Sequence, residues 1–144
     1  MNEKINDFIR RQSCATICCL DDRGMPYCFN CYYLFDEQEM LLIFKSSPGS
    51  SHFNWMARQP ELAGTILPDK LSKLFTKGIQ FQGRRLAQDS PHYDTAKSNY
   101  YKKHPEALAI GGEIQLVQID RVKFTDSTLG FGKKQLWERG GSTD

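Results

Sequence analysis

The sequence has 144 residues, of which 40% are hydrophobic and 25% charged, with 19 basic against 17 acidic side chains. This length supports one domain with a full hydrophobic core, over residues 1–144, and the composition excludes a disordered or fibrous chain. A formal net charge of +2 is too small to indicate nucleic acid or an anionic membrane as the main partner.

The N-terminal region predicts a short helix. Within residues 2–12, Ile5, Phe8 and Ile9 follow helical spacing and Asn2 can cap the first turn. The same region lacks the apolar centre of a secretory signal, and no apolar stretch of the chain approaches the roughly 20 residues of a membrane-spanning helix. We therefore expect a cytoplasmic protein.

A β-hairpin is predicted next. Cys14–Leu20 suits a strand, residues 21–24 form a polar turn, and Pro26–Phe35 is a second strand rich in aromatic residues. Both faces of this second strand are largely apolar, which predicts that the core covers one face and a ligand or second subunit the other.

A homodimer is therefore expected, because Cys28, Tyr32 and Leu34 would otherwise form an exposed apolar patch. The alternative is that a later helix of the same chain covers this patch, with the side chains of Tyr93, Ala96 and Tyr100.

The remaining elements are mostly strands with two more short helices. Further strands are predicted at Met40–Lys45, Glu61–Leu67, Gly78–Ala87, Glu113–Thr125 and Leu136–Trp137. One helix has Ser50 or Ser51 as its cap and ends before Pro60. The other has Ser90 as its cap, Pro91 at its first position and its end before Pro105. An irregularity near Val117 predicts a bulge, and residues 140–144 predict a frayed tail.

This order of elements predicts a mainly β fold with some α, namely a small antiparallel barrel with helices at its ends; the split form of the barrel (a split β-barrel) is implied only by the family resemblance described below. We expect a six- to seven-stranded antiparallel, Greek-key-like barrel with about three short helices.

All five cysteines lie within the first 31 residues, at positions 14, 18, 19, 28 and 31. Their odd number and their placement in strands predict reduced thiols that pack as small hydrophobic side chains. Cys28 and Cys31 form a C-x-x-C pair, but its strand-like surroundings do not suit a redox or zinc motif.

The segment from Ile43 to His52 is the first candidate site. It joins a strand to a helix start whose free N–H groups lie among hydroxyls, one lysine and one histidine, as a phosphate site requires. An ordinary capped, serine-rich loop is an equally weighted explanation.

The second candidate is the polar face of the strand at 78–87, where Gln80, Gln82 and Arg84 could meet the edge of a heteroaromatic ligand. A solvated sheet face explains the same pattern. A third segment, with Gly130, Gly132 and Lys133, lacks the P-loop spacing and predicts a tight turn with lysines near an anion.

The sequence gives little support for a hydrolase, a metalloenzyme or a nucleic-acid-binding protein. The sequence has no legible Ser/His/Asp or Cys/His arrangement, and His52, His92 and His104 lack metal-ligand spacing, so no metal site is expected. The helix around residues 93–103 is basic and aromatic, but a solvated face explains it better than nucleic-acid binding does.

Several strings of the sequence resemble the flavin mononucleotide (FMN)-binding split-barrel superfamily of pyridoxamine-5′-phosphate oxidase, and most closely its YhbP-like branch. The resemblance covers nearly the whole chain, and its most distinctive strings are Gly78–Gly83 and the run from Lys123 to Lys134. The other matching strings are Tyr32–Asp36, the serine-rich loop leading into His52–Asn54, and Leu62–Ile66.

The resemblance implies a homodimer with FMN at the subunit interface. The phosphate would be held by Lys45, Ser46, Ser47, Ser51 and His52. The ring and ribityl groups would meet Asn30 and Cys31, and Gln82 or Gln80 would reach the cofactor. Trp137 would close the site.

The sequence departs from the true oxidases in two places. Ser51 and His52 stand where the oxidases carry basic residues, and no Arg-x-His segment lies near Trp137. We therefore expect a flavin-dependent oxidoreductase of an unknown small molecule rather than pyridoxamine-phosphate oxidation. The alternatives are a flavin- or haem-binding protein without turnover and a barrel that binds single-stranded nucleic acid.

Overall fold

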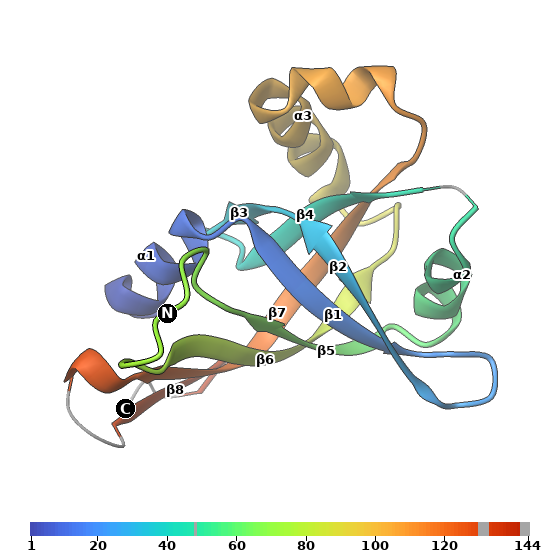
Figure 1. The fold of residues 1–144 in the computed structure, drawn as a ribbon. Helices are drawn as coiled ribbons and strands as arrows, with labels where there is room; N and C mark the ends of the chain where they lie inside the picture. Colours follow the sequence, from blue (N-terminus) through green and yellow to red (C-terminus); the bar gives the residue numbers. More distant parts are fainter. Residues whose placement is uncertain (48, 130–132, 142–144) are drawn as a thin grey trace.

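The computed structural model describes residues 1–47, 49–129 and 133–141 (Figure 1). Its helices are α1 (Glu3–Arg11), α2 (Ser51–Arg58) and α3 (Tyr93–Lys103), with short 3-10 turns η1 (Pro105–Ala109) and η2 (Ser127–Leu129). Its strands are β1 (Cys14–Leu20), β2 (Pro26–Tyr32), β3 (Leu34–Asp36), β4 (Leu41–Ser46), β5 (Glu61–Ile66), β6 (Lys77–Leu86), β7 (Glu113–Asp126) and β8 (Lys134–Glu138).

All these strands form one antiparallel sheet in the order β2-β1-β5-β6-β7-β4-β3, with β8 also paired to β7. The sheet curls into a half-barrel (Figure 1), because its two end strands, β2 and β3, are consecutive in the chain and separated by Tyr33 alone. β7 is long enough to pair with β4 along residues 113–118 and with β8 along 121–125. The predicted mainly β split-barrel fold is confirmed.

Tyr33 divides the strand that was predicted over Pro26–Phe35. Its ring is buried, its hydroxyl donates a hydrogen bond to the Ile9 carbonyl oxygen at 2.6 Å, and its N–H donates to Ser13. These contacts bind the chain to the end of α1, so that the residues after Tyr33 pair with β4 instead of continuing β2.

The main core lies inside the curled sheet. It contains Ile17, Phe44 and Phe81 from the strands, together with Ile5 and Ile9 from α1. Alternate residues of each strand therefore point inward, which confirms Ile79 and Phe81 as core residues and leaves Gln80 and Gln82 exposed.

α3 covers a second apolar cluster on the outer side of β4 and β7. Leu41 and Ile43 pack there against Ala96 and Tyr100, and Leu34 is packed against the same cluster. Within one chain, α3 thus covers Leu34, while Cys28 is exposed and the Tyr32 side chain is 73% exposed.

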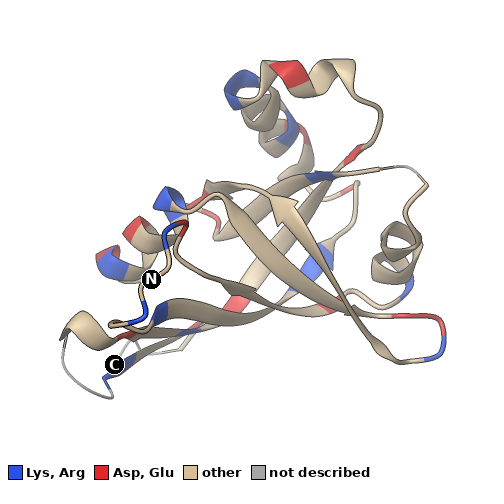
Figure 2. Ribbon diagram, viewed as in Figure 1, with Lys and Arg blue, Asp and Glu red and all other residues tan. Residues whose placement is uncertain are grey.

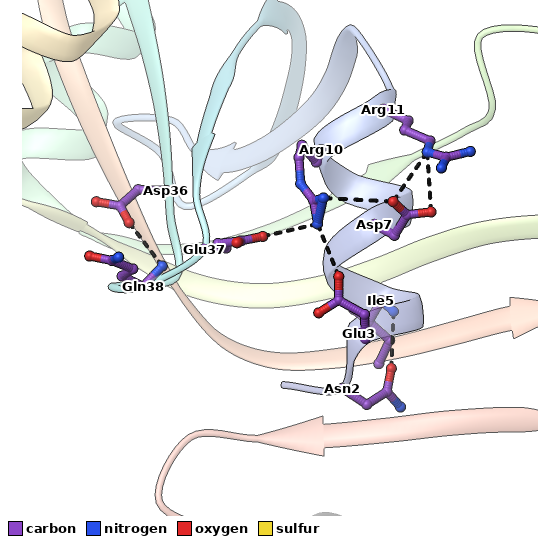
Figure 3. A network of polar contacts seen from close by, with 9 residues as sticks. All are labelled: Asn2, Glu3, Ile5, Asp7, Arg10, Arg11, Asp36, Glu37 and Gln38. Carbon is purple, nitrogen blue, oxygen red and sulfur yellow. Dashed lines mark hydrogen bonds and ion pairs between the residues drawn. The ribbon is translucent and has the colours of Figure 1, made fainter.

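A polar network holds α1 in place (Figure 3). Asn2 accepts a hydrogen bond from the Ile5 N–H at 3.0 Å, which confirms the predicted cap. Arg10 pairs with Glu3 and Asp7 of its own helix, and with Glu37 after β3 at 3.1 Å. The last pair joins the helix to the β3–β4 turn.

Two predicted details are wrong by a few residues. α3 begins at Tyr93 rather than Pro91, because Ser90 instead closes a turn by accepting the Tyr93 N–H. The bulge lies opposite Gln82 and Gly83, at Asp120 rather than near Val117. A Cβ on Gly83 would lie 2.0 Å from the Gln118 carbonyl oxygen, so glycine permits this close approach of β7.

Basic and acidic residues both occur on α1, on α3 and at the β1–β2 hairpin (Figure 2). No helix among the described residues is long and apolar enough to cross a membrane. The predicted glycine turn at 130–132 and the last three residues of the predicted tail, 142–144, lie outside the described residues.

Candidate functional site

A groove of about 870 Å³ runs across the outer face of the sheet. It is lined by residues of β1, β2, β5, β6, β7 and β8. Its volume is within the range of small-molecule and cofactor sites, roughly 300–1,000 Å³. The groove is therefore large enough for a flat heteroaromatic ligand.

Strand register arranges this face of the sheet in two rows that cross six strands, and every member of the rows except Asn30 lines the groove. The first, here called the threonine row, consists of Asn30, Thr16, Thr65, Gln80, Lys123 and Leu136. The second, here called the cysteine row, consists of Cys28, Cys18, Ala63, Gln82, Arg121 and Glu138. Each member lies directly beside the next one on the neighbouring strand.

The rows contain three of the residues predicted for the site, and a fourth lines the groove. Gln80 and Gln82 each lie at the centre of one row, and Trp137 also lines the groove. Asn30 ends the threonine row, where its side-chain oxygen accepts a hydrogen bond from the Thr16 hydroxyl at 2.7 Å. These residues come from β2, β6 and β8, so only the folded sheet brings them to one region of the molecule.

Three basic residues also line the groove. They are Arg121 and Lys123 on β7, which the sequence analysis did not single out as site residues, and Lys134 on β8, one of the two lysines that the third candidate segment places near an anion. Arg121 donates to the Gln82 side-chain oxygen at 3.5 Å and pairs with Glu138 at 3.6 Å. The period-two alternation of residues 113–125 was the available signal, since it places Arg121 and Lys123 on one face.

The predicted phosphate segment lies apart from the groove, and none of Lys45, Ser46, Ser47, Ser51 and His52 lines it. Lys45 turns toward η1, where its ammonium donates to the carbonyl oxygens of Ala107 and Ile110 and lies 5.0 Å from the Tyr101 ring centre. Ser46 is buried, and its hydroxyl has no hydrogen-bond partner among the residues that the structure describes.

The start of α2 keeps an anion-compatible form. The Ser50 hydroxyl donates to the Ser47 carbonyl oxygen and makes no side-chain cap for the helix. Ser47 and Ser51 are exposed, while His52 is half-buried with its ring stacked on Phe29. Burial lowers the pKa of His52, so any anion bound at neutral pH would be held by N–H and O–H donors rather than by an imidazolium.

Cys31 belongs to the core, where burial raises the pKa of its thiol to about 12. Its side chain therefore cannot reach a ligand on the outer face, and only its backbone could do so. All five cysteines are free thiols. In the part of the chain that the structure describes, no three His, Cys, Asp or Glu side chains gather in a way that could hold a metal ion.

Comparison with known proteins decides the family. No protein-family model matches the sequence. The UPF0306 protein YhbP of Escherichia coli O139:H28 is 30% identical over 140 residues, which cover 97% of this chain and 95% of that protein. The chain belongs to the UPF0306 YhbP family. The predicted resemblance to the YhbP-like branch is thus confirmed.

Solved structures support the fold that this YhbP family member adopts. A haem-binding protein from Mycobacterium smegmatis matches with a TM-score of 0.78 and 13% identity, over 94% of this chain and 57% of that one. A pyridoxamine 5′-phosphate oxidase-related, FMN-binding protein from Nostoc punctiforme matches with a TM-score of 0.65 and 11% identity, over 88% and 80% of the two chains. At these identities the likeness shows a shared split-barrel fold, and the YhbP chain spans little more than half of the mycobacterial protein.

Proposed function

We propose that this YhbP family member binds FMN in a homodimer and uses it as an oxidoreductase of a small molecule. The observation that carries the proposal is the outer-face groove, where Gln80 and Gln82 lie side by side on the exposed face of β6. The FMN-binding protein of the same fold supports it.

The groove fits the chemistry of a flavin ring. A glutamine amide carries two N–H donors and one carbonyl acceptor, which suits the alternating donors and acceptors of the pyrimidine edge of a flavin. Thr16 and Thr65 add hydroxyl groups to the same floor. The small side chain of Ala63 leaves space above the centre of the sheet.

The separation between this groove and the start of α2 favours two copies. Ser51 and His52 do not line the groove of their own chain, yet they offer the anion-compatible donors that a flavin phosphate requires. In a two-fold dimer, the α2 start of one subunit can approach the groove of its partner. The exposed Tyr32, two residues from Asn30 on the same face of β2, offers an apolar contact for such a pairing.

Bound flavin would supply the electron or hydride transfer itself. The residues of the chain would bind and orient it: Gln80 and Gln82 the ring, and the start of α2 the phosphate. Because the flavin carries out the transfer, the protein needs to supply no acid or base.

Absorbance and fluorescence titration test the proposal. Added FMN is expected to lose fluorescence as it binds, with a Kd in the micromolar range or below, about −8 kcal/mol at 1 μM. Bound flavin that is reduced anaerobically and then reoxidised by a small-molecule acceptor would establish the redox part. Unchanged FMN fluorescence at protein concentrations of tens of micromolar would refute the proposal.

Haem is the second candidate, supported by the haem-binding protein of the same fold. Haem iron requires an axial ligand such as His, Cys, Met or Tyr. Among the described residues that line the groove, Cys18 and Cys28 are the only ones of these types. A Soret band that appears on addition of haemin, and that shifts in Cys18→Ser or Cys28→Ser, would favour haem over flavin.

A further inference from the structure

Cys18 and Cys28 lie directly opposite each other on β1 and β2, at one end of the cysteine row. Both side chains line the groove, with Cys28 exposed and Cys18 partly exposed. The other cysteines have different neighbours: Cys14 faces Tyr32, while Cys19 and Cys31 point into the core. One pair among the five thiols is therefore placed to react within the groove.

The hydrogen-bond pattern between β1 and β2 places this pair at one of the two types of position in the ladder, the one where opposed side chains are closer. The Asp21 N–H donates to the Met25 carbonyl oxygen, and the Tyr33 N–H donates to that of Ser13. These bonds mark odd-numbered β1 positions as hydrogen-bonded pairs, so Cys18 and Cys28 occupy a non-hydrogen-bonded pair, where side chains approach most closely.

This position meets the geometric requirement for a disulfide. The Cα atoms of opposed residues in a non-hydrogen-bonded pair lie about 4.5 Å apart, which is inside the range of roughly 4.4–6.8 Å seen in disulfides. Because β2 is an end strand of the sheet, small adjustments of its backbone leave the interior strands in place.

We propose that Cys18 and Cys28 form a redox-active dithiol that closes reversibly to a cross-strand disulfide in the groove. This proposal does not rest on flavin binding. The oxidant is a small disulfide of the glutathione type. The Cys28 thiolate attacks it and releases one thiol, and the Cys18 thiol then displaces the second and completes the protein disulfide. One S–S bond breaks, one forms, and the two protein protons pass to the two released thiols.

The surroundings assign the order of these steps. Cys28 is the more exposed of the two and can meet the oxidant first. Burial, and then the neighbouring Cys28 thiol, raise the pKa of Cys18, which keeps it protonated and slow to attack a free oxidant. Once Cys28 carries the mixed disulfide, the position of Cys18 directly opposite makes the second step intramolecular.

Oxidation of the full-length chain tests the proposal. The fully reduced protein is incubated without air in oxidised glutathione, denatured, and labelled with a maleimide for mass spectrometry. Wild-type protein is expected to lose two of its five thiols without retaining glutathione, and dithiothreitol should restore both. Five free thiols, a retained mixed disulfide, or a disulfide-linked dimer would each overturn the proposal.

Serine variants identify the pair, because trypsin leaves Cys14, Cys18 and Cys19 on one peptide between Arg11 and Arg23. Cys18→Ser should retain one glutathione, and Cys28→Ser should form no internal disulfide. Cys14→Ser is the matched control, since it lies on the same face of β1 opposite Tyr32, and should oxidise as the wild type does. Loss of the disulfide in Cys14→Ser, or its persistence in Cys18→Ser, would overturn the assignment.

Discussion

The imidazole of His52 lies flat on the phenyl ring of Phe29, with ring centroids 3.9 Å apart and ring planes 10° from parallel. This stack joins the first turn of α2 to β2. Phe29 in turn packs against Phe44 in the core, with ring centroids 6.0 Å apart. The start of α2 is thus joined to the barrel by this stack, while the edge-on contact of Trp55 with Tyr27 and the buried Met56 hold the rest of the helix.

The stack predicts a pH-dependent stability. Burial lowers the pKa of His52 in the folded chain, so the unfolded chain, with a histidine pKa of about 6.5, binds the proton more readily. The uncharged His52 therefore adds to the free energy of unfolding in full at pH values above about 6.5. This stabilisation is lost as the pH falls from about 6.5 through the lower pKa of the folded chain. Urea unfolding at pH 7, 6 and 5 should show a smaller decline in His52→Phe, which keeps an aromatic ring but cannot titrate. Equal declines in the two proteins would contradict this role.

The start of α2 is predicted to bind the phosphate of FMN and not its ring. The double substitution Ser51→Ala/His52→Ala should weaken FMN by up to about 1.5–3 kcal/mol, the usual value of a charge-assisted hydrogen bond. Riboflavin, which lacks the phosphate, should bind the variant as it binds the wild type in the same fluorescence titration. An equal loss for both ligands would place the phosphate elsewhere, with Arg121 and Lys123 as the next residues to replace.

Gln82 is predicted to contact the flavin ring, because it occupies the centre of the cysteine row. Gln82→Ala should weaken FMN and riboflavin alike, by about 0.5–1.5 kcal/mol for one hydrogen bond. Gln38→Ala in the β3–β4 turn removes an exposed glutamine outside the groove and should leave both affinities unchanged. Similar effects of the two substitutions would remove Gln82 from the site.

Tyr32 is predicted to lie in the subunit interface. Its side chain is 73% exposed, so Tyr32→Glu should leave the folded chain intact while shifting sedimentation toward the monomer and weakening FMN. Leu108→Glu, on a leucine that is 68% exposed in η1, is the matched control and should remain dimeric. Leu34 is unsuitable for this test because α3 covers it. A monomeric Tyr32→Glu variant with full FMN affinity would disprove the shared site.

Gly83 is predicted to be essential for the bulge between β6 and β7. Gly83→Ala places a Cβ against the Gln118 backbone and should lower the free energy of unfolding by about 1–3 kcal/mol, as overpacking does. Gly111→Ala is the control, because a Cβ there meets nothing within 4 Å. Urea unfolding of both variants measures the difference, and equal stabilities would show that β7 can shift to admit the methyl group.

The sequence by itself determined the local elements, because their signals are carried by neighbouring residues. Cys14–Leu20 was predicted with the bounds that β1 has, since a polar turn ends it. Asn2 and the spacing of Ile5, Phe8 and Ile9 predicted α1. The alternation of Ile79 and Phe81 with Gln80 and Gln82 predicted which face of β6 is buried. A resemblance across the whole chain added the split-barrel fold.

Only the tertiary structure decided which of these local faces meet. The break at Tyr33 depends on its contact with Ile9, and the direction of Lys45 depends on carbonyl groups about sixty residues later in the chain. The groove arises from register between strands that are far apart in sequence, which joins Asn30 of β2 to Leu136 of β8 in one row. Spacing along one strand sets the face on which a side chain lies, but pairing among six strands sets its neighbours, and the chemistry of this site depends on those neighbours.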